Sequence, residues 1–170
     1  MKNYIVIMLF FSSSTAWSQK EIKPTDEFIV AGQIEHELKF GISDLEKFPT
    51  QKIEDMVVSN HLGEKKGTAK NLKGILLKDI LSKIEFKVES PKQLSEFYLI
   101  FIASDNYKVV YSWNEIFNSS TGDNLFLIME KDGKGIKEMP ERILTITTTD
   151  FKTGRRNVKG LAKIIVGRAD

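Results

Sequence analysis

The sequence contains no cysteine among its 170 residues. This absence excludes a disulfide framework, a cysteine zinc site, an iron–sulfur cluster, a catalytic thiol and any metal held by a protein thiolate. Histidine is also scarce: the chain has only His36 and His61, which lie far apart and without the HExxH spacing of zinc enzymes. The residue types therefore predict no metal site.

An excess of charge of one sign is also missing. The chain has 25 Lys and Arg against 23 Asp and Glu, a formal net charge of +2. Nucleic-acid-binding domains are usually strongly basic, so we expect no nucleic-acid partner. Apolar residues make up 41% and charged residues 28%, which is ordinary for a globular protein.

Long apolar runs are lacking as well. Residues 4–11 (YIVIMLFF) would span only about 12 Å as a helix, far less than a bilayer core of roughly 30 Å. This run follows Lys2 and precedes a polar stretch in which Ala16 and Ser18 occupy the −3 and −1 positions of a signal-peptidase site. We expect residues 1–18 to be a cleaved signal peptide. The mature protein would be periplasmic or secreted, without a membrane span, and would begin with an extension, residues 19–26.

Strand patterns dominate the remaining chain. Their β-branched, aromatic or alternating residues predict strands at 27–32, 36–40, 52–59, 97–103, 107–111, 124–130, 142–149 and 160–166. Residues 97–103 are continuously apolar, which predicts a strand buried on both faces. Residues 60–72 look like a loop, and 131–137 like a solvated hairpin tip.

Apolar residues at helical spacing predict one main helix at 75–84. Ser43 is placed to cap a short helix at 44–47, and Ser112 a single turn ending at Phe117. The fold class is therefore α+β: one β-dominated domain, residues 27–170, with a mixed sheet, one main helix and short flanking helices.

Four stretches, taken together and in order, resemble the molybdopterin-binding domain of the sulfite oxidase family. They are residues 28–32 (FIVAG) with 42–45 (ISDL), 74–81 (GILLKDIL), 103–107 (ASDNY), and 139–144 (MPERIL) with 158–166 (VKGLAKIIV). The resemblance implies that family's mixed α+β fold and molybdopterin as the cofactor.

The chain departs from this family at two positions. The family's metal-binding cysteine lies in the loop that follows the strand matching residues 56–58, and here residues 59–63 read SNHLG. Hydroxyl and amide groups are poor replacements for a soft thiolate ligand. Gly160 also stands where the family usually has tryptophan. We therefore do not expect this chain to oxidise sulfite.

The resemblance and the local charge select six candidate ligand-binding residues. Asn60 and His61 match the metal-binding loop, and Asp105 could form a partial site with His61. Arg155, Arg156 and Lys159 form a cluster of positive charge suited to a phosphate or pyrophosphate group. The alternatives are polar residues in an exposed loop, a turn-forming aspartate and a charged turn between two strands.

We found no catalytic constellation, and catalytic residues remain unassigned. The leading interpretation is an exported, non-catalytic binder of a pterin-type or other small anionic ligand. One alternative is a molybdopterin-dependent oxidoreductase subunit that works with a partner chain. Another is an accessory protein that binds a partner protein and no ligand.

Overall fold

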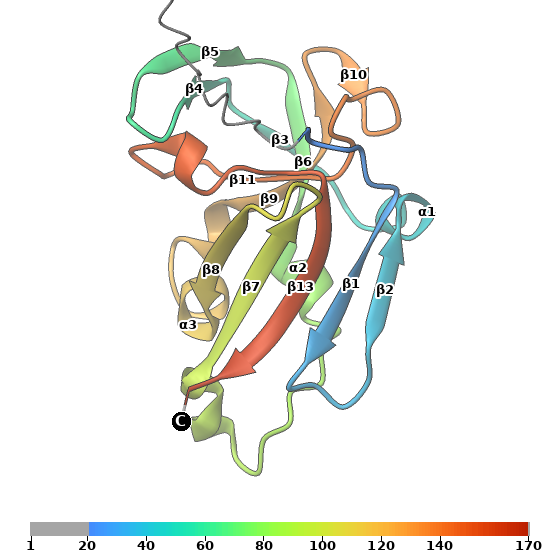
Figure 1. Cartoon of the computed structure of the whole chain (residues 1–170), viewed down its shortest axis with the longest axis vertical. Helices are drawn as coiled ribbons and strands as arrows, with labels where there is room; N and C mark the ends of the chain where they lie inside the picture. Colours follow the sequence, from blue (N-terminus) through green and yellow to red (C-terminus); the bar gives the residue numbers. More distant parts are fainter. Residues whose placement is uncertain (1–20, 170) are drawn as a thin grey trace, which may run out of the picture.

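The structure, a computed structural model, describes residues 21–169, whose strands form two β-sheets and a separate hairpin (Figure 1). The predicted signal peptide, residues 1–18, lies outside the described residues. Within residues 21–169, no helix has both the length and the apolar character needed to cross a membrane.

The first sheet has the C-terminal strand at its centre. In spatial order its strands are β2 (Leu38–Gly41), β1 (Glu27–Gly32), β13 (Leu161–Arg168), β7 (Phe97–Ala103) and β8 (Lys108–Ser112). The β1–β13 pair is parallel, and the other neighbours are antiparallel. The sheet is thus mixed, as the sequence predicted, and its central pair joins the two ends of the described chain.

The second sheet packs against the first through a shared core. Its strands are β12 (Val158–Lys159), β11 (Leu144–Thr147), β9 (Leu125–Lys131), β6 (Leu72–Leu76) and β3 (Gln51–Ile53), with β10 (Lys134–Gly135) paired to β9. Buried apolar residues of both sheets form one cluster, which includes Phe28, Phe101 and Leu127.

The remaining elements are short. β4 (Met56–Ser59) and β5 (Lys65–Ala69) form a separate antiparallel hairpin. The helices are α1 (Ile42–Leu45), α2 (Leu77–Leu81) and α3 (Trp113–Phe117), with 3₁₀ turns η1 (Pro91–Glu96), η2 (Gly122–Asn124) and η3 (Thr153–Arg155). The described chain is therefore β-dominated α+β, as predicted.

The predicted loop at 60–72 was wrong, because it contains β5. Val57 of β4 pairs with Thr68 of β5, although the latter strand begins with Lys65 and Lys66. Lysines are common on exposed edge strands, where they oppose aggregation, and they hid the strand pattern here. The β4–β5 hairpin forms one wall of the candidate site.

The predicted helix at 75–84 was too long. Only Leu77–Leu81 is α-helical, and Ile75 and Leu76 belong to β6, where they pair with Leu127 and Phe126 of β9. Pairing with a neighbouring strand satisfies the backbone groups of these residues and overrides their helical spacing. The main helix of the prediction is thus one turn following a strand.

Two further boundaries differ from the prediction. The single strand predicted at 52–59 is two strands, β3 and β4, which lie in different sheets. The helix predicted at 44–47 begins at Ile42, and the Gly41 backbone N–H donates to the Asp44 carboxylate at 3.2 Å. Ser43 is therefore inside the helix and is not its cap.

The β7–β8 hairpin and the turn after it agree with the prediction. β7 has the predicted bounds, and Ser112 caps α3 by accepting a hydrogen bond from the Glu115 backbone N–H at 3.1 Å. β7 is not buried on both faces, because buried and half-buried residues alternate along it. The half-buried residues lie on the outer face of the sheet.

Candidate functional site

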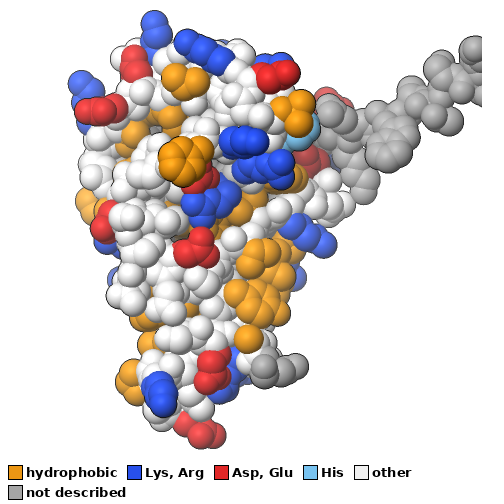
Figure 2. Space-filling model, turned by 90° about the vertical axis from the view of Figure 1, so that its left-hand side faces the viewer, with side chains coloured by type: hydrophobic (Ala, Val, Ile, Leu, Met, Phe, Trp, Pro, Cys, Tyr) orange, Lys and Arg blue, Asp and Glu red, His pale blue; other side chains and the backbone are white. Residues whose placement is uncertain are grey.

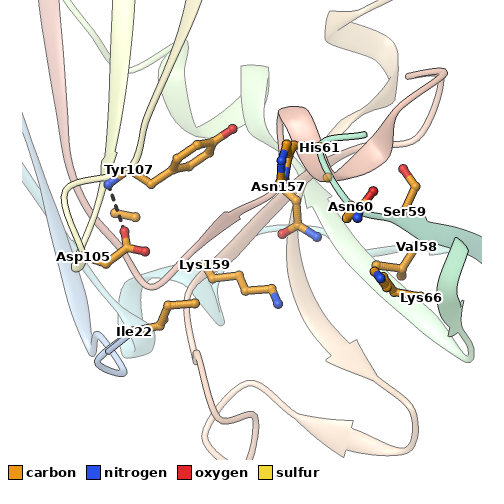
Figure 3. A pocket seen from close by; sticks show the side chains of 12 residues that line it. Ile22, Val58, Ser59, Asn60, His61, Lys66, Asp105, Tyr107, Asn157 and Lys159 are labelled. Carbon is orange, nitrogen blue, oxygen red and sulfur yellow. Dashed lines mark hydrogen bonds between the residues drawn. The ribbon is translucent and has the colours of Figure 1, made fainter. Parts of the chain in front are cut away.

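A cleft of about 620 Å³ lies between the β4–β5 hairpin, the β7–β8 turn and the segment that connects η3 to β12 (Figure 3). This volume is in the usual range for small-molecule sites, about 300–1,000 Å³. Four of the six predicted residues line the cleft. The twelve lining residues are Ile22, Val58, Ser59, Asn60, His61, Lys66, Ala103, Asp105, Tyr107, Gly154, Asn157 and Lys159.

Thr153 connects η3 to β4 of the hairpin through side-chain hydrogen bonds. The Thr153 hydroxyl accepts a hydrogen bond from the Ser59 backbone N–H at 2.9 Å and donates to the Val57 carbonyl at 3.1 Å. Next to it, Gly154 lies so close to β4 that a Cβ atom would be 2.3 Å from the Ser59 carbonyl oxygen. The cleft therefore depends on a close approach of two segments distant in sequence.

Asn60 lines the cleft, but the polar groups of its side chain have partners in its own turn. Its Oδ1 accepts from the backbone N–H groups of Leu62 and Glu64, both at 3.0 Å, and its Nδ2 donates to the Glu64 carboxylate at 2.9 Å. Asn60 thus shapes the loop. Beside it, the His61 carbonyl accepts a hydrogen bond from Arg155 Nε at 2.9 Å, which joins the loop to η3.

Asp105 and Tyr107 form the opposite wall. The Asp105 carboxylate accepts from the Tyr107 backbone N–H at 2.9 Å, a turn contact that the sequence alternative anticipated (Figure 3). The Tyr107 hydroxyl donates to the Arg155 carbonyl at 2.6 Å and connects this turn to η3. Asp105 and His61 both line the cleft, but no group of three or more metal-ligating side chains occurs within residues 21–169.

Lys159 and Asn157 are the polar groups of the cleft best placed to meet a ligand. Among the described residues, the exposed Lys159 has no ion pair, and the buried Asn157 Oδ1 has no hydrogen-bond partner. Both side chains line the cleft (Figure 3). Lys66 adds a second ammonium group, which forms an ion pair with the Glu64 carboxylate at 3.3 Å. The ammonium group of Lys159 and the amide oxygen of Asn157 are thus the groups available to a ligand.

The structure does not bring the two arginines into the cleft lining. Arg156 Nε donates to Asp150 at 2.8 Å, its Nη1 donates to Glu115 at 3.1 Å, and its guanidinium lies 5.0 Å from the Tyr111 ring centroid. Hydrogen bonding to Asp150 raises the pKa of Arg156 above its usual range. Its charge is therefore already compensated, whereas Arg155 contributes through the two backbone-linked contacts described above.

The predicted N-terminal extension contributes to the site. Ile22 lines the cleft, and the neighbouring Lys23 exchanges two hydrogen bonds with the Ser104 hydroxyl, at 2.9 and 2.7 Å. Gly160 has a φ of +62°, and a Cβ atom there would lie 2.5 Å from the Lys23 carbonyl oxygen. The space beside Gly160 is thus occupied by residues 22 and 23.

Comparison with known proteins identifies the fold. No family model and no curated protein match the sequence. Among solved structures, the crystal structure of the sulfane dehydrogenase SoxCD from Paracoccus pantotrophus is similar, with a TM-score of 0.62 and 14% identity over 87% of this chain. The chain has the fold of part of this dehydrogenase.

The likeness to SoxCD is limited to the fold and to one portion of that protein. The aligned region is 40% of the SoxCD chain, so our chain spans less than half of its length. At 14% identity, correspondence of individual site residues does not follow. The similarity agrees with the predicted relationship at the level of the fold.

Proposed function

We propose that the cleft binds a small anionic ligand of the pterin type and that the protein is a non-catalytic binder. The observation that carries this proposal is that two polar groups without partners among the described residues line the same cleft: the ammonium group of Lys159 and the buried Oδ1 of Asn157. An ammonium group attracts a phosphate or other oxyanion, and an amide oxygen accepts from N–H groups. A phosphate-bearing pterin carries both complementary features.

The donor set fits the organic part of a molybdopterin better than its metal. Ser59, the first residue of the stretch that resembles the family's cysteine-bearing loop, is the last residue of β4; it is buried, and its hydroxyl lies 3.2 Å from that of Thr153. The chain contains no cysteine at all. Lys159 and Asn157 would hold the anionic and N–H groups of the ligand, whereas no thiolate is present to bind molybdenum.

The first test is native mass spectrometry with metal analysis of protein purified from the exported fraction of its own cells. We expect an added mass that matches a pterin or another small anion, without stoichiometric molybdenum or tungsten. N-terminal sequencing of the same sample tests the proposed cleavage before Gln19. A bare mass together with no binding in the titration below would refute the proposal.

The second test is a calorimetric titration with a named probe, pterin-6-carboxylate, which carries both N–H donors and an oxyanion. Lys159→Ala should weaken binding at least tenfold, because the cation is lost. Lys92→Ala, which removes an exposed lysine from η1 outside the cleft, is the matched control and should leave the affinity unchanged. If the Lys159→Ala and Lys92→Ala variants bound the probe with equal affinity, Lys159 would not be part of the binding site.

A second candidate function is that of an oxidoreductase subunit working with a partner chain and holding molybdopterin. The fold shared with part of a sulfane dehydrogenase favours it. In that case the metal would be held without a thiolate from this chain, because the chain contains no cysteine. Stoichiometric molybdenum in the purified native protein would select this function over the first.

A further inference from the structure

We infer that the outer face of the five-stranded sheet docks a second protein, whose contact surface is apolar and places a carboxylate opposite Lys163. The first observation is the direction of the side chains. Along β7, Leu99 and Phe101 are buried in the core, whereas Tyr98, Ile100 and Ile102 are half-buried and lie on the opposite face. The outward residues of this strand are therefore as apolar as the inward ones.

The apolar side chains continue across the sheet in register. Ala31 of β1 pairs with Ile165 of β13, Ile165 pairs with Ile100 of β7, and Ile100 pairs with Val110 of β8. Cross-strand neighbours on one face lie about 5 Å apart, so these four side chains form a continuous row. Val110, at the edge, is 56% exposed.

No described element covers this row. In Figure 1 the sheet lies in front of α2, and no helix or strand within residues 21–169 crosses its near side. Figure 2, which is turned by 90°, shows hydrophobic side chains gathered toward its right-hand edge, where this face is seen from the side. Contiguous apolar surface of this kind on a folded protein usually marks an interaction site.

The position of Lys163 indicates the chemistry of the occupant. It lies on the central strand, in the row next to the apolar one, between Ile29 and Ile102. It is exposed and has no ion pair among the described residues. A partner that covered this lysine without supplying an anion would bury an uncompensated charge, which is strongly unfavourable.

The same lysine disfavours a second copy of this chain as the occupant. Ile102 also pairs with Lys108, so one row of the face carries two lysines without ion pairs within the described chain. Glu27 of β1, an acid on this face, is engaged by Lys39 at 2.7 Å. Two such faces packed together would oppose like charges near their centre, whereas a partner with an acidic group would complement them.

The experiment places the photo-crosslinking residue p-benzoylphenylalanine at Ile100 in the full chain, expressed in its native cells. The matched control carries it at Val57, an exposed apolar position on β4 that is not part of this sheet. We expect one protein to be crosslinked from position 100 and not from position 57. That protein is then identified by peptide mass spectrometry, purified, and its affinity for the unmodified chain measured.

Charge reversal decides whether the contact has the proposed chemistry. Lys163→Glu should weaken binding of the purified partner at least tenfold. Lys92→Glu, the matched control, should leave this affinity unchanged. Replacing the partner carboxylate that faces position 163 with lysine should restore binding to the Lys163→Glu variant. The inference is overturned by a crosslink to a second copy of this chain or by unchanged affinity of Lys163→Glu. It is also overturned if position 100 yields no crosslink, because Lys163 would then only keep an uncovered face soluble.

Discussion

At the scale of single residues, burial of Tyr111 couples the stability of the fold to alkaline pH. Its side chain is fully buried, its hydroxyl lies 2.9 Å from that of Thr147, and burial raises its pKa to about 12. Between pH 10 and 12 the unfolded chain releases this proton while the folded chain retains it. The free energy of unfolding should therefore fall as pH rises, by about 2–3 kcal/mol in total.

The test compares urea unfolding of the wild type and Tyr111→Phe at pH 8 and pH 11.5. At pH 8 the variant should be less stable by about 1 kcal/mol, because the hydrogen bond to Thr147 is lost. At pH 11.5 this difference should shrink or reverse, because phenylalanine has no proton to release. Tyr107→Phe, which changes an exposed tyrosine, should retain the full alkaline decrease. Parallel pH profiles for wild type and Tyr111→Phe would contradict the prediction.

Arg156 should contribute mainly to stability. Arg156→Ala would leave the Asp150 carboxylate, whose side chain is 11% exposed, without its partner, and should lower the free energy of unfolding by about 2–4 kcal/mol. The control Lys137→Ala breaks an exposed pair with Glu46 and should cost less than about 1 kcal/mol. Chemical denaturation measures both, and equal small losses would show that the Arg156 contacts are dispensable.

The site residues show what a sequence can and cannot provide. Asn60, His61, Asp105 and Lys159, which the family resemblance and the local charge singled out as ligand-binding candidates, all line one cleft, and their role in binding stays a prediction. Arg156 has the same residue type as a phosphate ligand, but its partners are Asp150 and Glu115, the second of which is 41 positions away. Local sequence contains no signal for such a partner.

At the scale of elements, the cleft depends on the contact between β4 and η3. Gly154→Ala would place a Cβ atom 2.3 Å from the Ser59 carbonyl oxygen, so one of the two backbone segments must move. We expect a loss of stability of about 1–3 kcal/mol, typical of overpacking, and faster hydrogen exchange in residues 57–59. The proposed ligand should also bind more weakly.

The matched control for this change is Gly67→Ala in β5. A Cβ atom there meets nothing within 4 Å, and its φ is not in the left-handed region. The free energy of unfolding of this variant should match that of the wild type within about 0.5 kcal/mol. Its hydrogen-exchange rates in residues 57–59 should be unchanged. If Gly154→Ala and Gly67→Ala behave alike, the close approach of β4 and η3 does not determine the cleft.

Elements were predicted best where the signal is local. β7 is a short, continuously apolar run, and α3 carries a Ser112–Glu115 capping box, so both are determined within a few residues. The predictions for β5 and for the N-terminal part of the helix were wrong because the conformation of both segments depends on distant partners. The pairing of Thr68 with Val57 makes the first segment a strand, and the pairing of Leu76 with Phe126 does the same for the second. The propensity of a short stretch of sequence does not contain that information.

At the scale of the whole molecule, the two sheets share one core and should unfold together. Buried residues of the five-stranded sheet and of the second sheet belong to a single cluster, which includes Ile164 of β13 and Ile146 of β11. A domain with one contiguous core usually unfolds in one cooperative transition. Within the five-stranded sheet, the parallel β1–β13 pair joins the first and last strands of the described chain.

Two matched substitutions test this cooperativity. Ile164→Val and Ile146→Val each remove one buried methylene group from a different sheet and should each cost about 0.5–1.5 kcal/mol. Trp113, the sole tryptophan after residue 18, follows β8 of the first sheet and gives a local fluorescence signal, while far-ultraviolet circular dichroism reports on both sheets. Because the sheets share one core, Ile146→Val should shift the Trp113 transition as much as it shifts the dichroism transition. A Trp113 midpoint that responds to Ile164→Val alone would mean that the two sheets unfold separately, and that the cleft beside them can open without loss of the five-stranded sheet.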